Sequence, residues 1–220
     1  MPIGARRRRS RVVVRLWRSV FAPTAHGGRC SGRPKADRIA ELSQRNLTLL
    51  PATIGETSSV HTIRRATADD GAILQEMLAI AADWRPDAPA RSLAEIMAEP
   101  ALAHYVAGWP AEGEVGFVVE DRRPLGAAWW RFFPDHDPGY GFVDGATPEV
   151  SIGVVADARG QGFGTLLLGA LIEEARRGAA RALSLSVASD NPAAALYQRL
   201  GFVTIGRVGG SFTMVLQLAA

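Results

Sequence analysis

Cysteine is almost absent from this 220-residue chain, and long apolar runs are missing. The single cysteine, Cys30, cannot form a disulfide within the chain, and the four scattered histidines have no metal-ligand spacing. No stretch approaches 18 apolar residues, so we expect no membrane-spanning helix. A secretory signal is not expected either, since Arg15 and Arg18 interrupt the short apolar run that starts at residues 12–14. These absences favour a cytoplasmic protein without a metal.

Acidic residues are scarce at the start of the chain. Residues 1–60 hold twelve lysines and arginines against three acidic residues, a balance of +9, whereas residues 61–220 carry −6. We assign residues 1–59 to a basic N-terminal extension that is either disordered or misannotated. A functional arm that binds nucleic acid and a targeting peptide stay open as alternatives, although we do not expect nucleic acid as a partner.

Residues 60–220 have the periodicity of one domain of mixed α/β type. Alternating or short apolar runs predict seven strands, at residues 61–66, 114–120, 125–133, 150–155, 182–188, 202–208 and 212–218. Helical spacing and capping residues predict helices near residues 70–81, 92–99, 101–107, 163–178 and 192–200. The acidic charge of this part suits a cationic partner such as an amine.

A glycine-rich turn at residues 159–165 lies between the predicted strand 150–155 and the helix that follows it. Gly162 and Gly164 have no Cβ, so the backbone can approach a bulky anion, and the first helical turn offers free N–H groups. The segment is not a P-loop, because no Gly-Lys-Ser/Thr follows, and it lacks the order of the dinucleotide fingerprint. It therefore predicts a site for phosphate or pyrophosphate, or else a turn that only lets helix and strand pack.

The turn resembles the Arg/Gln-x-x-Gly-x-Gly/Ala loop that holds coenzyme A pyrophosphate in the GNAT superfamily of acyl-CoA N-acyltransferases. A second hallmark lies about 30 residues on, where Asn191 starts a helix and Leu196-Tyr197-x-x-Leu200-Gly201-Phe202 ends it. The resemblance runs from His61 to the C-terminus. It implies a central twisted mixed sheet of about seven strands with helices on both faces.

The resemblance also implies acetyl-CoA as co-substrate and a set of residues that bind it. Arg159 would pair with phosphate, the glycine amides would hold pyrophosphate, and the strand near Val154 would bond to the pantetheine arm. Asn191 would cap its helix, in addition to any contact with the cofactor arm. The expected cofactor-binding residues are Val154, Arg159, Gly160, Gln161, Gly162, Phe163, Gly164, Thr165 and Asn191.

Two residues are candidates for proton transfer. Tyr197 resembles the family's general acid, which protonates the departing thiolate, although its helical spacing also fits plain packing. Glu149 is a candidate general base, and the alternative is an exposed carboxylate at a strand end. Ser186 stands where some protein N-terminal acetyltransferases of the superfamily carry a glutamate, which weakens the case for a protein-alanine acceptor.

The resulting hypothesis is an N-acetyltransferase that moves an acetyl group from acetyl-CoA to a small-molecule primary amine by direct attack. The alternatives are a coenzyme A-binding regulatory domain without transfer activity and a protein or peptide N-acetyltransferase. Tyr140 and Phe142, in the loop before residue 149, are candidates for an acceptor pocket. A homodimer is one possible assembly.

Overall fold

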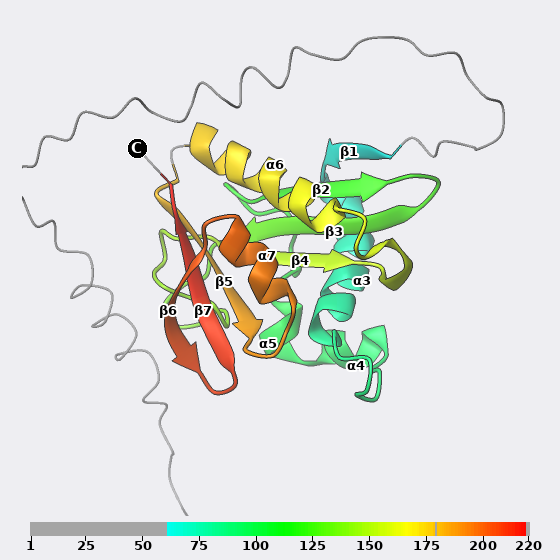
Figure 1. The fold of residues 1–220 in the computed structure, drawn as a ribbon, viewed down its shortest axis with the longest axis horizontal. Coiled ribbons are helices and arrows are strands. Elements are labelled where there is room, and N and C mark those ends of the chain that lie inside the picture. The colour runs from blue at the N-terminus through cyan, green and yellow to red at the C-terminus, as the bar shows by residue number, and fades with distance from the viewer. Residues whose placement is uncertain (1–60, 179, 219–220) are drawn as a thin grey trace, which may run out of the picture.

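One mixed seven-stranded sheet organises the part of the chain that the computed structural model describes, residues 61–178 and 180–218 (Figure 1). The sheet has the predicted seven strands, and their order is β1-β2-β3-β4-β5-β7-β6. The basic extension at residues 1–59 lies outside the described residues. The strands are β1 (Thr62–Arg65), β2 (Val115–Glu120), β3 (Pro124–Arg131), β4 (Glu149–Val154), β5 (Ala182–Ala188), β6 (Val203–Val208) and β7 (Ser211–Gln217).

Helices cover both faces of the sheet, as expected (Figure 1). The long helix α6 (Phe163–Arg177) and the short α7 (Ala193–Arg199) pack on one face. Helix α3 (Gly71–Ala82) packs on the other face, with α4 (Leu93–Ala98) and α5 (Pro100–Ala103) beside it. Two 3-10 turns, Ala68–Asp70 and Ala156–Ala158, precede α3 and the glycine loop.

The alternation of β3 explains how one strand serves two hydrophobic cores. Trp129 packs into the core under α3 and is fully buried, whereas Trp130 packs into the core under α6 and is 5% exposed. Each indole N–H donates to a backbone carbonyl, of Tyr105 and Gly113 respectively. Adjacent tryptophans therefore anchor the two helical layers to the same strand.

Local capping signals place several helix ends. Ser92 and Glu95 form the predicted capping box at the start of α4. The predicted helix at residues 101–107 is shorter than expected: α5 ends at Ala103, and the chain continues in tight turns whose amides bond three residues back, as Tyr105 does to Leu102. None of the described helices has both the length and the apolar character that crossing a membrane requires.

The two central strands β4 and β5 part soon after they meet. They run parallel and pair at one register position, Glu149 opposite Ser184. Beyond that position β4 continues with β3, whereas β5 continues with β7. Because the two strands separate, the edge of β4 that faces β5 is left unpaired. The candidate site lies in the gap between them.

Helix α3 approaches β4 very closely at Gly153. A Cβ at that position would lie 2.2 Å from the carbonyl oxygen of Met77, so only glycine allows this contact. The close approach brings the C-terminal half of α3 beside the opening between β4 and β5.

Candidate active site

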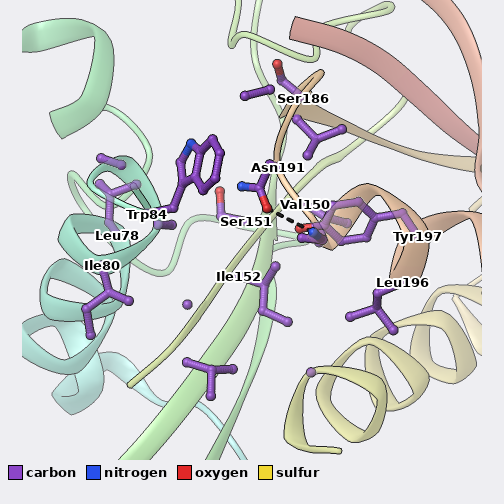
Figure 2. A pocket seen from close by; sticks show the side chains of 18 of the residues that line it. Leu78, Ile80, Trp84, Val150, Ser151, Ile152, Ser186, Asn191, Leu196 and Tyr197 are labelled. Carbon is purple, nitrogen blue, oxygen red and sulfur yellow. Dashed lines mark hydrogen bonds between the residues drawn. The ribbon is translucent and has the colours of Figure 1, made fainter. Parts of the chain in front are cut away.

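A cavity of about 770 Å³ occupies the opening between β4 and β5. Figure 2 shows Leu78 and Trp84 on the α3 side of the cavity and Tyr197 on the α7 side, with Ile152 of β4 between them. All of the expected catalytic and cofactor-binding residues line this cavity, with one exception, Gln161. The volume lies in the range of small-molecule sites.

The glycine loop forms one end of the cavity. Gly160 and Gly162 have φ angles of +77° and +89°, which favour glycine, and a Cβ on either would meet no atom within 4 Å. Gly162 is the N-cap of α6, a helix of 15 residues, so the free amides of its first turn adjoin the cavity. An open backbone, free amides and the positive end of a helix dipole fit a pyrophosphate.

Gly164 has a packing role within the same loop. A Cβ at this position would lie 3.1 Å from Cδ2 of Leu196, so the first turn of α6 packs tightly against α7. The glycines of the loop therefore differ in role: Gly160 and Gly162 leave the backbone open, whereas Gly164 lets two helices meet.

Polar side chains around the loop have unequal access to the cavity. The amide Nε2 of Gln161 donates to the carbonyl of Asp157 at 2.9 Å, and Gln161 does not line the cavity. Arg159 lines it, with Nε 3.2 Å from the carbonyl oxygen of Val154. Sequence reasoning missed Arg199, the last residue of α7, which is exposed and also lines the cavity. The only sequence feature that could have indicated Arg199 is its position two residues after Tyr197.

Asn191 caps the helix that carries Tyr197, as predicted. Its side-chain Oδ1 accepts a hydrogen bond from the backbone N–H of Ala193 at 2.9 Å, the bond that is dashed in Figure 2. The regular helix begins at Ala193, one residue later than expected. Asn191 also lines the cavity, so its capping role and a contact with a ligand are compatible.

Tyr197 is both a packing residue and a cavity residue. It is 7% exposed, and its ring packs edge-on to Phe202 with a centroid distance of 6.1 Å. Burial raises the pKa of Tyr197 to about 12, so the phenol keeps its proton at neutral pH. The cavity therefore has a permanently protonated O–H donor on the α7 side.

Glu149 is buried, so the expectation of an exposed carboxylate at a strand end is wrong. The residue is 3% exposed, and its Oε1 accepts hydrogen bonds from Tyr105 Oη and from the backbone N–H of Gly141, both at 2.7 Å. Its Oε2 is buried and has no hydrogen-bond partner in the described structure. Burial raises the pKa of Glu149 to about 7, and the two hydrogen bonds oppose part of that rise.

Two glycines let the preceding loop close over Glu149. A Cβ on Gly139 would lie 2.2 Å from Glu149 Oε2, and a Cβ on Gly141 would lie 2.4 Å from the backbone carbon of Leu185. Tyr105, which sequence reasoning missed, connects to the same loop because its Oη accepts from the backbone N–H of Tyr140 at 2.6 Å. No local pattern marked Tyr105, which lies 44 residues before Glu149.

The loop before β4 contributes one of its two candidate aromatic residues. Tyr140 lines the cavity and is half exposed, whereas Phe142 packs against the core under α3. Ser186 lines the cavity from β5 (Figure 2). Within residues 61–178 and 180–218, no group of three histidines, cysteines or acidic residues could hold a metal ion.

These features define a domain that binds an acyl-CoA and brings it beside ionisable side chains. The family model described as the Acetyltransferase (GNAT) family matches residues 76–202, and the chain belongs to this family. The protein is therefore an acetyl-CoA-dependent acetyltransferase. A search of curated proteins found no match.

Solved structures agree with this assignment. An acetyltransferase structure from Salmonella typhimurium, with acetyl-CoA as its cofactor, is 27% identical with a TM-score of 0.52, over 72% of this chain and 94% of that one. A ribosomal-protein-alanine N-acetyltransferase from Brucella melitensis is 26% identical with a TM-score of 0.52, over 71% and 99%. A phosphinothricin acetyltransferase from Sinorhizobium meliloti, in complex with acetyl-CoA, shares the fold at 22% identity and a TM-score of 0.53, over 72% and 88%.

Proposed function

We propose that this acetyltransferase, acting through a domain at residues 60–220, transfers the acetyl group to the primary amine of a small molecule. The observation that carries the proposal is the Glu149 carboxylate, buried at the cavity with one oxygen bonded and the other without a partner. A buried carboxylate whose pKa lies near neutrality is suited to accept a proton during a reaction.

Glu149 solves the first chemical problem, which is that an alkyl amine has a pKa of about 10 and arrives protonated. With a pKa of about 7, Glu149 is ionised for much of the time at neutral pH and can take a proton from the amine, directly or through water. The amine nitrogen then attacks the thioester carbonyl, a C–N bond forms and the C–S bond breaks. One proton of the ammonium ends on Glu149. The second proton that the nitrogen loses as the amide forms passes to sulfur, which receives the electron pair of the broken C–S bond.

Tyr197 solves the second problem, which is the negative charge that develops on sulfur. Its pKa of about 12 makes it a weaker acid than an ordinary thiol of pKa about 8.5, so full proton transfer is uphill by about 5 kcal/mol. Burial also raises the pKa of the thiol, which narrows this gap. We therefore assign Tyr197 the role of a hydrogen-bond donor to the thiolate, with proton transfer completed as the product leaves.

The remaining predicted residues hold the co-substrate. The amides around Gly160, Gly162 and Thr165 bind the pyrophosphate, and Arg159 and Arg199 offer exposed guanidinium groups to phosphate. The free edge of β4 pairs with the pantetheine arm in the manner of an added strand. Arg159 Nε, which bonds to the Val154 carbonyl, releases it when the arm binds.

The acceptor side supports a small molecule over the protein alternative. Ser186 lines the cavity where a protein-directed enzyme of the superfamily can carry a glutamate, and a hydroxyl of this kind cannot serve as a base. The Brucella melitensis relative is named for action on a ribosomal-protein alanine. A peptide acceptor is therefore the alternative to test.

Release of free thiol by the full chain tests the proposal. Acetyl-CoA would be incubated with a panel of small primary amines, and separately with a peptide that begins with alanine. Turnover of amines, lost in Glu149→Gln, supports the proposal. Turnover of the peptide alone would replace the acceptor, and acetyl-CoA binding without turnover of either would favour the regulatory alternative.

A further inference from the structure

The end of the cavity farthest from the glycine loop has its own side-chain chemistry. We define the acceptor mouth as Trp84, Arg91, Glu99 and Tyr140, which all line the cavity. The ring of Tyr140 stacks on that of Tyr105 at 6.2 Å, and Tyr105 bonds to Glu149 at the start of β4. The glycine loop follows the C-terminal end of β4. A strand of six residues places its two ends about 17 Å apart.

Arg91 is the only mouth residue that could bind an acceptor carboxylate, but two carboxylates already engage it. Its Nε and Nη2 donate to Asp83 Oδ1 at 2.9 and 2.7 Å, and its backbone N–H donates to Oδ2 at 2.7 Å. Its Nη1 donates to Glu99 Oε2 at 3.1 Å. An arginine that recognises a ligand carboxylate needs a free pair of N–H donors, and most of this fork is occupied.

The charge balance of the acceptor mouth is negative. Asp83 lies outside the cavity and pairs with Arg91, so the charge of Glu99 has no further cation among the mouth residues to balance it, and Glu149 adds negative charge when it is ionised. Burial raises the pKa of Tyr140, the charge of Glu99 adds to the rise and the charge of Arg91 opposes it, because both charges lie near this ring.

The other charges nearby do not reverse this balance. Arg85 lies over the Trp84 ring at 4.7 Å but pairs with Asp190 at 2.7 Å. The remaining surface is apolar or aromatic: Trp84 lies beside Leu78 on the α3 side (Figure 2), and Leu102 and Tyr140 contribute from α5 and the loop before β4.

We propose that the acceptor is a cationic amine with an apolar or aromatic body and no carboxylate beside the amine, an arylalkylamine rather than an α-amino acid. The ammonium group enters past Glu99 toward the buried carboxylate of Glu149, and the body rests between Trp84 and Tyr140. A carboxylate on the same carbon would meet Glu99 at the mouth, where Arg91 is already paired with Asp83 and Glu99. This inference rests on the proposed function, because it assumes a small-molecule amine.

Matched acceptor pairs test the inference with the full chain. Phenethylamine is compared with phenylalanine, and tryptamine with tryptophan, so that each pair differs only in the carboxylate. Phenylalaninamide keeps the bulk of the substituent without its charge. We expect kcat/KM to favour each decarboxylated amine by about tenfold or more, with phenylalaninamide closer to the amine than to the acid.

Variants add a second readout. Glu99→Gln should raise KM for phenethylamine several-fold and reduce the preference over phenylalanine, because it removes one of the two carboxylates. Glu173→Gln is the matched control: this exposed glutamate pairs with Arg176 on α6, away from the cavity, and the preference should stay unchanged.

The outcomes separate the two proposals. Equal or better use of the amino acids, with turnover intact, overturns the inference and leaves the proposed function standing. No turnover of any small amine, with the alanine peptide consumed or with acetyl-CoA bound and unused, overturns both. An unchanged preference in Glu99→Gln overturns the role assigned to the mouth charge.

Discussion

Tyr105 Oη lies 2.7 Å from Glu149 Oε1 and 2.6 Å from the backbone nitrogen of Tyr140. The phenol donates to the carboxylate and accepts from the loop amide, so one side chain connects the candidate base to the loop that covers it. The same arrangement leaves Oε2 of Glu149 without a partner. The geometry therefore holds one carboxylate oxygen in two hydrogen bonds and leaves the other buried beside Gly139 without a partner.

Replacing Glu149 by glutamine should remove the base and keep its shape. The side-chain oxygen of glutamine can still accept from Tyr105 and Gly141, so the loop keeps its hydrogen bonds. We expect kcat to fall by about 10²- to 10⁴-fold at neutral pH, the usual contribution of general base catalysis. Thiol release measures the rate, and thermal unfolding with acetyl-CoA verifies that the co-substrate still binds. A variant with wild-type kcat would exclude Glu149 as the base.

The pH dependence of the rate should report the state of Glu149. At pH values well below the amine's pKa of about 10, where the acceptor is almost wholly protonated, kcat/KM should fall below about pH 7, where Glu149 becomes protonated. In Tyr105→Phe the midpoint of this fall in kcat/KM should move to higher pH by about one unit, because the lost hydrogen bond had lowered the pKa of Glu149. Tyr140→Phe is the control, since Tyr105 bonds only to the backbone of residue 140. An unchanged midpoint in Tyr105→Phe would mean that Tyr105 only supports the structure and does not tune the pKa of Glu149.

Stability should also depend on the charge of Glu149. Its pKa is about 7 in the folded protein against 4.5 as the ordinary value, so the folded state holds the proton more tightly. Stability from this group is full below pH 4.5 and is lost as the pH rises to about 7, by about 3 kcal/mol. Between those pH values the free energy of unfolding of the wild type should fall more than that of Glu149→Gln, as denaturant titrations can measure. Parallel pH profiles for the two proteins would contradict the raised pKa.

Replacing Tyr197 by phenylalanine should affect chemistry more than binding. The ring keeps its contact with Phe202, but the donor to the departing thiolate is lost. We expect kcat to fall by about 10²-fold, similar to the loss of one preorganised donor elsewhere, with KM for acetyl-CoA within a few-fold of wild type. Steady-state kinetics with acetyl-CoA varied distinguish the two parameters. A large rise in KM with normal kcat would assign Tyr197 to binding instead.

The glycine loop can be tested with two alanine substitutions in the same region. Gly162→Ala forces a Cβ onto a φ of +89°, which should cost about 1–2 kcal/mol of stability and weaken acetyl-CoA binding. Gly169→Ala lies within α6, where a Cβ meets no atom within 4 Å, and should stabilise the helix by up to about 1 kcal/mol. Thermal unfolding with and without acetyl-CoA measures both effects. An equal thermal shift by acetyl-CoA in the two variants would remove Gly162 from the site.

Local pattern was sufficient to predict most of the helices and strands and most of the residues that line the glycine-loop end of the cavity. Alternation in β3 placed Trp129 and Trp130 on opposite faces, because side chains of a strand alternate whatever packs against them. The Gly162 turn and the Asn191 cap depend on backbone conformation and on bonds between residues close in sequence, such as Asn191 to Ala193. Such features can be recognised without knowledge of the rest of the fold.

The acceptor half was decided only by tertiary structure. The sequence left Glu149 as either a base or an exposed carboxylate, because burial depends on how the preceding loop and Tyr105 pack around it. Tyr105 reaches Glu149 from 44 residues away, and Asp83 and Glu99 engage Arg91 from opposite sides in the sequence. Sequence by itself determined the strands, most of the helices and the glycine-rich turn, since short-range geometry controls them. The fold determined which carboxylate is buried, which arginine is occupied and what charge the acceptor meets, since these depend on packing between segments far apart in the chain.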